Sequence, residues 1–390
     1  MEKKIIKKKL KELKLSSNYR IRKIKDSGNS HLFLYKNKEY LSFASNDYLS
    51  LANDKRIIKA AKIALDKHGY STSSSALISG YTASHHKLEE EISEFLGQEK
   101  TLLFSTGYQA NLGVIKALVS RDDNIIADQL NHASLIDGSI LSRANFKRYN
   151  HNDYKDLEKK ILKFKAKNNL IISDSLFSMD GDIANIKKLS IKARKHKSSL
   201  LIDEAHSLGV FGPEGRGLVY GSSLCKEKNI FVTGTFGKSI GTFGAFFSGE
   251  QDYVEYVMQK SRSYIYSTSL PVNAVEATRK SLKIINKEDW RREKLFSLIN
   301  YYKKNIYKSG FLSFESDSQI QAILIGSSKD AMYISEELLK KSIYIPAIRP
   351  PTVKEGSARL RVSLTVDHEE DDIDYLINIL HTISINLVQS

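Results

Sequence analysis

The chain has 390 residues, of which 41% are hydrophobic and 27% are charged, with a formal net charge of +15 at pH 7. This composition is typical of a soluble globular protein of two or three domains, and no apolar run approaches the roughly 20 residues that span a bilayer, so we expect no membrane span. A single cysteine, Cys225, excludes an internal disulfide and has no neighbours at zinc-ligand spacing. We therefore expect a cytoplasmic protein without a metal site.

The basic charge is concentrated at the start of the chain, in the segment MEKKIIKKKLKELKLSSNYRIRKIK. Ile5, Ile6, Leu10 and Leu13 recur at near-helical spacing among its lysines, which predicts an amphipathic docking helix with a solvated charged face. Such a helix explains the charge without nucleic acid as a partner. The basic surface would still attract an acidic partner such as coenzyme A or an acyl carrier protein.

The next segments predict an arm and a large α/β domain. LFLYKNKEYLSF is typical of a hairpin with KNK as its turn, and with the basic segment it makes an arm over residues 1–45. Between about residues 100 and 250, strand candidates alternate with helical patterns, which predicts a mainly parallel sheet with helices on both faces. The strand candidates are TLLFS, NIIAD, NLIISD, SSLLIDE, NIFVTG and GAFFSG. We assign this large domain to residues 46–285.

The pattern changes after Pro271. A long helical stretch through Trp290 to Tyr307 is followed by a shorter alternation of strand and helix patterns. In chain order these are QAILI, a helix around Ala331 to Lys341, SIYIPAI, ARLRVSLT and a closing helix from His368. This alternation predicts a smaller α/β domain over residues 286–390.

Two apolar runs end on reactive side chains. LLIDEAH ends in Asp203, Glu204, Ala205 and His206, and VTGTFGKS is centred on Lys238. Buried parallel strands deliver such side chains to one edge of a sheet. A lysine that holds pyridoxal phosphate as a Schiff base, and an acid that keeps its ring nitrogen protonated, would meet there.

The same letters also resemble the motifs of a DEAH-type, nucleic-acid-dependent ATPase. A phosphate-binding loop of that kind needs a glycine five residues before its final one, and Val232 stands at that position before Gly237. The order is also reversed, because GKS follows DEAH here. Both facts disfavour the ATPase hypothesis.

Three further segments can serve the same cofactor. In FSTGYQANLG a strand runs into a helix at Gly107, where free amides suit a phosphate, although a plain strand-to-helix turn has the same pattern. His132 follows a strand and opens a helix, so it could lie over a cofactor ring or meet substrate, or be structural. Ser178, in DSLFSMDGD, could reach the phenolic oxygen of the cofactor, or simply lie in a polar turn.

Motifs spread from Ser45 to Val353 resemble those of the α-oxoamine synthases, which are fold-type I pyridoxal phosphate enzymes. The matching strings are SNDYL, SGY, NHASL, FSMDGD, DEAHSLGVFGPEGRG, TFGKS, IYSTSLP and IRPPTV. The resemblance implies an aspartate-aminotransferase-like fold and a homodimer with shared active sites. It implies an acyltransferase of biotin biosynthesis that condenses L-alanine with a pimeloyl thioester, with loss of CO2. Glycine C-acetyltransferase and 5-aminolevulinate synthase share the main motifs and stay as alternatives, and the acyl donor can be a coenzyme A or a carrier-protein thioester.

Matched position by position, the resemblance implies three catalytic residues. Lys238 is the Schiff-base lysine, Asp203 is the partner of the pyridine nitrogen, and His132 stacks on the ring and helps to hold substrate. His206 and Ser178 flank the phenolic oxygen of the cofactor.

The resemblance also implies the phosphate contacts. Gly107, Tyr108 and Thr235 match phosphate-binding positions, and Ser267 and Thr268 match a phosphate contact that is made from the neighbouring subunit.

For the substrates, Arg361 matches the arginine that binds the carboxylate of the amino acid, with Asn46 nearby. Arg20 and Thr352 match contacts to the acyl substrate, with Arg22 in the same basic run as an alternative to Arg20.

Overall fold

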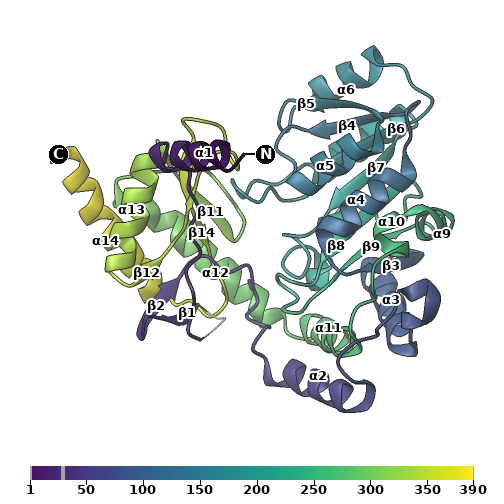
Figure 1. Cartoon of the computed structure of the whole chain (residues 1–390), viewed down its shortest axis with the longest axis horizontal. Coiled ribbons are helices and arrows are strands. Elements are labelled where there is room, and N and C mark those ends of the chain that lie inside the picture. Colours follow the sequence, from purple (N-terminus) through teal and green to yellow (C-terminus); the bar gives the residue numbers. More distant parts are fainter. Residues whose placement is uncertain (1, 28–30, 390) are drawn as a thin grey trace. The chain divides into compact units, whose positions relative to one another are not determined.

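The computed structural model describes residues 2–27 and 31–389 and divides the chain into two compact units (Figure 1). Unit 1 comprises the described residues of Met1–Ser50, Ser178–Asp182 and Trp290–Ser390. Unit 2 comprises Leu51–Phe177 and Ile183–Asp289. The domain limits that we expect from the sequence, 46–285 and 286–390, stay a prediction about folding units.

Within the described residues, unit 2 is built on one seven-stranded sheet of order β3-β9-β8-β7-β6-β4-β5. The strands are β3 (Lys100–Phe104), β4 (Asn124–Asp128), β5 (Asn145–Tyr149), β6 (Asn169–Asp174), β7 (Ser199–Asp203), β8 (Ile230–Thr235) and β9 (Ala245–Gly249). Only β9 pairs antiparallel, with β3 and with β8, whereas β5, β4, β6, β7 and β8 are parallel. The predicted mainly parallel α/β fold is therefore confirmed.

All six strand candidates of the large domain form strands. The seventh strand of the sheet, β5, was not predicted from the sequence. Its sequence NFKRY carries two basic residues and lies at the edge of the sheet, half exposed, so it lacks the apolar run of a central strand.

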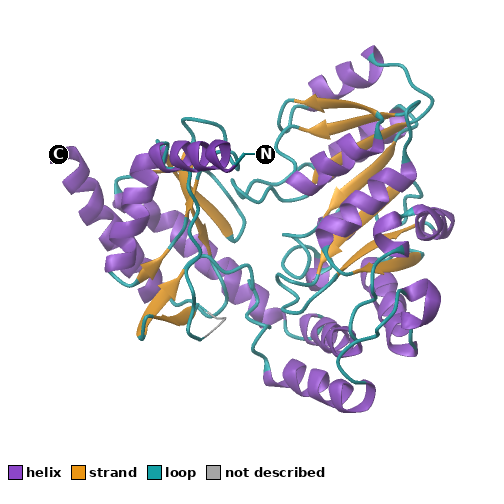
Figure 2. Cartoon of the chain, in the orientation of Figure 1, coloured by secondary structure: helices purple, strands orange, loops and turns teal. Residues whose placement is uncertain are grey.

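Helices precede, connect and follow these strands (Figure 2). They are α2 (Lys55–His68), α3 (Ala83–Leu96), α4 (Gly107–Leu118), α5 (Ala133–Ser142), α6 (Tyr154–Lys163), α7 (Ile186–Lys195), α8 (Leu218–Gly221), α9 (Gln251–Lys260), α10 (Arg262–Ile265) and α11 (Val272–Ile285), with short turns of other helix types at Ala76–Gly80 and Pro213–Gly215. Helix α4 packs on the sheet, where Val114 and Ile115 lie in the same buried core as Ile125, Leu201 and Phe231. This core fixes the strand ends that carry the chemistry.

Unit 1 begins with helix α1 (Lys3–Leu15) and the hairpin of β1 (Leu32–Tyr35) and β2 (Lys38–Ser42), both as predicted. The turn is the pair Lys36–Asn37 rather than KNK, because Lys38 already pairs with Tyr35. Both turn residues have positive φ, 53° and 57°, which matches the twist of a two-residue hairpin.

The C-terminal part of unit 1 adds strands and three long helices. These are α12 (Asp289–Asn305), β10 (Leu312–Ser313), β11 (Ile320–Gly326), α13 (Ser328–Lys340), β12 (Ile343–Tyr344), β13 (Ala347–Ile348), β14 (Ala358–Ser363) and α14 (Glu370–Gln389), with a 3-10 turn at Ile306–Ser309 after α12. One expectation is corrected here: SIYIPAI is not one strand, since β12 pairs with β2 and β13 pairs with β14 in another sheet. Pro346 lies between them and has no N–H to continue a ladder. Among the residues that the structure describes, no helix is long and apolar enough to cross a membrane.

Candidate active site

A cavity of about 180 Å³ lies in unit 2, where β6, β7 and β8 end. Seven residues that the sequence analysis proposed for the cofactor line it: Gly107, Tyr108, His132, Asp203, His206, Thr235 and Lys238. The remaining lining residues are Asn111, Ser134, Asp174, Ala205, Thr233 and Gly234. The carboxyl ends of parallel strands are the usual place for ligands in such a sheet, and here they bring residues more than 130 positions apart into one space.

Asp203 is the last residue of β7 and is almost fully buried, with 6% of its surface exposed. Its Oδ1 accepts a hydrogen bond from the Ala205 amide at 2.9 Å, and its Oδ2 accepts one from Asn111 Nδ2 at 2.7 Å. Asn111 is fixed in turn by Thr233, whose Oγ1 donates to its Oδ1 at 2.8 Å. Both donors to Asp203 are neutral, so they orient the carboxylate without supplying a counter-charge, which a cation in the cavity can provide.

Lys238 stands in the turn after β8, and its Nζ lies 2.8 Å from Nε2 of His206. Gly241 fixes this turn, because its φ is +70° and a Cβ there would lie 2.5 Å from the amide nitrogen of Ala52. The amine is therefore held on a tight, well-defined loop at the sheet edge.

His132 caps the N-terminus of α5, as expected for a histidine that opens a helix. Its Nδ1 accepts a hydrogen bond from the Ser134 amide at 3.3 Å, and its own amide donates to Oδ2 of Asp174 at 2.6 Å. Burial lowers the pKa of His132, against the opposing effect of Asp203. The imidazole is thus neutral at neutral pH, the state that suits stacking on a ring.

The start of helix α4 provides an anion site. Thr106 caps it by accepting from the Gln109 amide at 3.2 Å, and the first-turn amides of Gly107 and Tyr108 have no acceptor within the helix. A Cβ on Gly107 would come within 3.6 Å of Thr235, which stands across this end of the cavity. Amides at a helix N-terminus next to a threonine hydroxyl suit a phosphate group.

The cavity thus fits pyridoxal phosphate. The chemistry of the donor set matches each part of that molecule: an amine for its aldehyde, a buried carboxylate for its ring nitrogen, and a helix N-terminus for its phosphate.

Two residues of this site, Asn111 and Asp174, were not predicted from the sequence. Asp174 is the last residue of β6, beside Asp203 in the register of the sheet. Burial, and next the charge of Asp203, raise the pKa of Asp174 well above its usual range. The signal was present, since NLIISD ends on an acid just as LLID does. Asn111 lies in a helix and gave no comparable signal.

Arg361, Asn46 and Ser178 come together in unit 1. Both terminal nitrogens of Arg361 donate to Oδ1 of Asn46 at 3.2 Å, and its Nε donates to the carbonyl of Ser178 at 2.5 Å. Tyr48, which the sequence analysis also missed, lies 3.3 Å from Nη2, and burial raises the pKa of its phenol. Ser178 thus meets Arg361 through its backbone, and the cofactor contact of its hydroxyl stays a prediction.

The two residues expected at the acyl substrate also meet in unit 1. Nη2 of Arg20 donates to Oγ1 of Thr352 at 3.3 Å. Their role toward an acyl group stays a prediction.

Ser267 and Thr268 lie in unit 2 but do not line the 180 Å³ cavity. They line a separate narrow hollow, where the carbonyl of Thr268 accepts from Oγ of Ser105 at 3.2 Å. Their expected contact to the cofactor phosphate of the neighbouring subunit stays a prediction.

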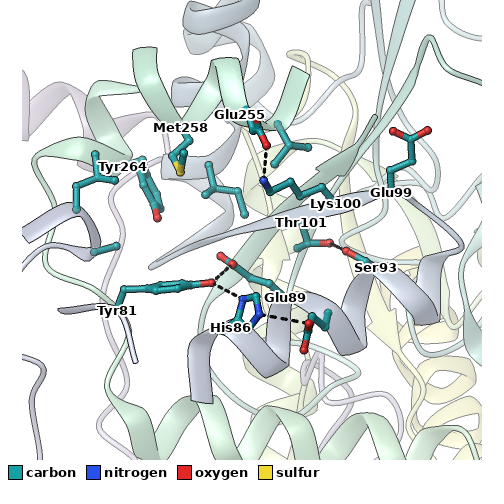
Figure 3. A pocket seen from close by; sticks show the side chains of 15 residues that line it. Tyr81, His86, Glu89, Ser93, Glu99, Lys100, Thr101, Glu255, Met258 and Tyr264 are labelled. Carbon is teal, nitrogen blue, oxygen red and sulfur yellow. Dashed lines mark hydrogen bonds and ion pairs between the residues drawn. The ribbon is translucent and has the colours of Figure 1, made fainter. Parts of the chain in front are cut away.

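A larger cavity in unit 2, of about 490 Å³, contains none of the predicted cofactor residues (Figure 3). Tyr81 donates to Glu89 at 2.6 Å there, and Lys100 pairs with Glu255 at 2.6 Å. Burial raises the pKa of Glu89 to about 7. Lys100 begins β3, so this cavity adjoins the amino end of a strand, away from the edge where the chemistry gathers.

This fold and this cavity define a pyridoxal phosphate enzyme, and comparison with known proteins agrees. The model of the family "Aminotransferase class I and II" matches residues 38–380. The chain belongs to this family.

Three relatives make the likeness more specific. An 8-amino-7-oxononanoate synthase of Saccharophagus degradans is 43% identical, over 88% of this chain and 86% of that protein. Another, of Methylococcus capsulatus, is 41% identical over 95% of this chain and 96% of that protein. A solved structure of SPT with its pyridoxal phosphate internal aldimine has a TM-score of 0.91 and 30% identity, covering 98% of this chain and 97% of that one. The predicted family and cofactor are confirmed, and the DEAH string belongs to this fold rather than to an ATPase.

Proposed function

We propose that the protein condenses L-alanine with a pimeloyl thioester to give 8-amino-7-oxononanoate, CO2 and a free thiol, a step of biotin biosynthesis. The observation that carries this proposal is the meeting of Lys238, Asp203 and His132 at one cavity, in a chain 43% identical to a protein named for that product. The class is an acyltransferase that depends on pyridoxal phosphate.

Pyridoxal phosphate, when bound, supplies an electron sink for the bonds that break at Cα of the amino acid. Lys238 would hold it covalently through Nζ and, once displaced by substrate, take the Cα proton on that nitrogen. His206, 2.8 Å away, is the group that can share this proton. The carboxylate of Asp203 would stabilise a positive charge on the ring nitrogen of the cofactor, and the hydrogen bond from Asn111 keeps that carboxylate in place.

For the substrates, we assign the alanine carboxylate to Arg361, whose planar guanidinium suits it, with Asn46 as its support. We assign the acyl chain to the surroundings of Arg20 and Thr352. Burial of a pimeloyl chain contributes about 0.8 kcal/mol per methylene, so it should be preferred over shorter acyl groups. Preference for alanine over glycine should be modest, because one methyl contributes only about 1 to 3 kcal/mol.

We further propose a cytoplasmic homodimer, in which Ser267 and Thr268 contact the cofactor phosphate of the partner. Mixing two inactive proteins tests this: Lys238→Ala, and a double variant with Ser267→Ala and Thr268→Ala. If each active site is shared, subunit exchange restores part of the activity, because one of the two sites in a mixed dimer keeps all its groups. No recovery under conditions of proven exchange contradicts shared sites.

Steady-state rates with L-alanine and glycine against pimeloyl, acetyl and succinyl thioesters test the reaction. We expect the highest kcat/KM for alanine with the pimeloyl thioester. A higher value for glycine with acetyl-CoA would instead assign a glycine C-acetyltransferase, and one for glycine with succinyl-CoA a 5-aminolevulinate synthase.

A further inference from the structure

Helix α1 carries a concentration of positive charge that the reaction itself does not use. Residues 2–25 contain eleven lysines and arginines against two glutamates, a formal +9 out of the +15 of the whole chain. None of the residues of α1 is buried. Its seven lysines have no acidic partner among the described residues. A shallow hollow of about 500 Å³ on the helix is lined by Lys4, Ile5, Lys7, Lys8 and Lys11.

The apolar stripe of α1 is exposed together with its lysines. Ile5, Ile6, Leu10 and Leu13 are 41% to 45% exposed, and Leu15, just beyond this stripe, is 76% exposed. A partner for this helix therefore needs acidic groups to meet the lysines and an apolar surface to meet the stripe, and an acidic protein offers both.

The helix is also tied to the residues assigned to the acyl substrate. The amides of Asn18 and Tyr19 both donate to the carbonyl of Leu13 at 2.9 Å and close its C-terminal end. The next residue, Arg20, donates to Thr352, and Arg349 from the same loop donates to the carbonyl of Ser17. A partner bound on α1 would thus lie on the same unit as the acyl contacts, and within a few residues of them in the chain.

We propose that α1 is the docking surface for an acyl carrier protein, an acidic protein that presents the acyl group as a thioester. This inference rests on the proposed function. Nucleic acid would satisfy the charge equally well, but it would not explain the connection to Arg20 and Thr352. Complementary charge of this kind raises association rates and gives a strong dependence on salt.

A charge-reversal variant, Lys4→Glu/Lys8→Glu/Lys11→Glu, tests the proposal with two acyl donors. One is the pimeloyl carrier protein, and the other is the pimeloyl thioester of N-acetylcysteamine, a neutral donor without a carrier. We expect kcat/KM with the carrier to fall by about tenfold or more, and kcat/KM with the neutral donor to stay within about twofold.

The matched control reverses three exposed lysines of α2, which carries no acyl contact: Lys59→Glu/Lys62→Glu/Lys67→Glu. It should leave both donors unaffected. Far-UV circular dichroism verifies that each variant keeps the helical content of the wild type.

The outcomes distinguish a failure of the proposed function from a failure of the docking proposal. If the wild type turns over neither donor, the proposed function fails, and the docking proposal with it. If the wild type is active and the α1 variant keeps its rate with the carrier, or loses both donors equally, the docking proposal alone is overturned. It is also overturned if duplex DNA or phosphatidylglycerol vesicles bind the wild type more tightly than the carrier does at the same salt concentration.

Discussion

Two buried polar centres, one around Asp203 in unit 2 and one around Arg361 in unit 1, are built in different ways. Asp203 is the last residue of its strand and lines a cavity. One neighbouring strand ends on Asp174, and the other is followed by the turn that contains Lys238. Arg361 lies inside strand β14, and its guanidinium is surrounded by oxygens of residues 46, 48, 178 and 363.

The difference lies in how each charge is satisfied. The carboxylate of Asp203 has neutral donors on its own chain and a cavity beside it, so a cation from a ligand can complete it. Arg361 has four oxygen acceptors on its own chain already. A substrate carboxylate must therefore compete with these oxygens, which predicts large effects at the first centre and moderate ones at the second.

Lys238→Ala should have the largest effect. The variant loses both the covalent anchor and the base, so turnover should fall by at least about 10² to 10⁴-fold, and the visible absorption of the lysine-bound cofactor should vanish. Absorption spectra and steady-state rates measure both. Turnover close to that of the wild type would remove Lys238 from the chemistry.

Asp203→Asn should follow, with a loss on the order of 10² to 10³-fold in kcat, because an amide cannot balance a positive charge on the bound ring. Asp174→Asn is the control at the neighbouring strand end. Burial and the neighbouring Asp203 raise the pKa of Asp174 and so disfavour a charge there, and an amide can still accept from the His132 amide, so the loss should be less than about tenfold. Equal losses in the two variants would show that burial rather than charge matters at this edge.

Arg361→Lys should mainly raise KM for the amino acid, by roughly 10 to 100-fold, with kcat changed much less. A lysine supplies the charge but not the bidentate geometry of the guanidinium. Tyr48→Phe removes only one hydroxyl near Nη2 and should change KM by less than about threefold. A variant with normal KM but reduced kcat would argue against substrate binding by Arg361.

Glu89→Gln, in the larger cavity, should have the smallest effect on turnover, within about twofold. Its effect is on stability, because burial raises the pKa of Glu89 from 4.5 to about 7. Between these pH values the folded state holds a proton that the unfolded state has lost, so stability of the wild type falls as pH rises. The stability of the wild type relative to the variant should drop by about 3 kcal/mol from pH 4 to pH 8.

Denaturant unfolding of both proteins across that pH range measures this difference. Glu94→Gln is the control, since Glu94 is exposed on the same helix and has no ion pair among the described residues, so it should leave the pH profile unchanged. A loss of turnover in Glu89→Gln at a pH where it is fully folded would give the larger cavity a part in catalysis.

The sequence by itself determined the sheet and most of the cofactor cavity. Apolar runs such as SSLLIDE form strands because burial on both faces demands a continuous apolar stretch, and parallel pairing then brings their carboxyl ends to one edge. That rule places Asp203 and Lys238 in one cavity, and the same rule would have found Asp174. It could not find Asn111, whose importance comes from a hydrogen bond between a helix and a strand 92 residues apart.

Only the tertiary structure decided which strands and side chains remote in sequence pair with one another where no local pattern indicates the partner. The edge strand β5, the separation of β12 from β13, and the meeting of Arg361 with the carbonyl of Ser178 depend on packing between segments remote in sequence. It also decided that the lysines of α1 have no acidic partner within the described residues. Local patterns report which face of an element is apolar, whereas the partner of that face is fixed only when the whole chain has packed.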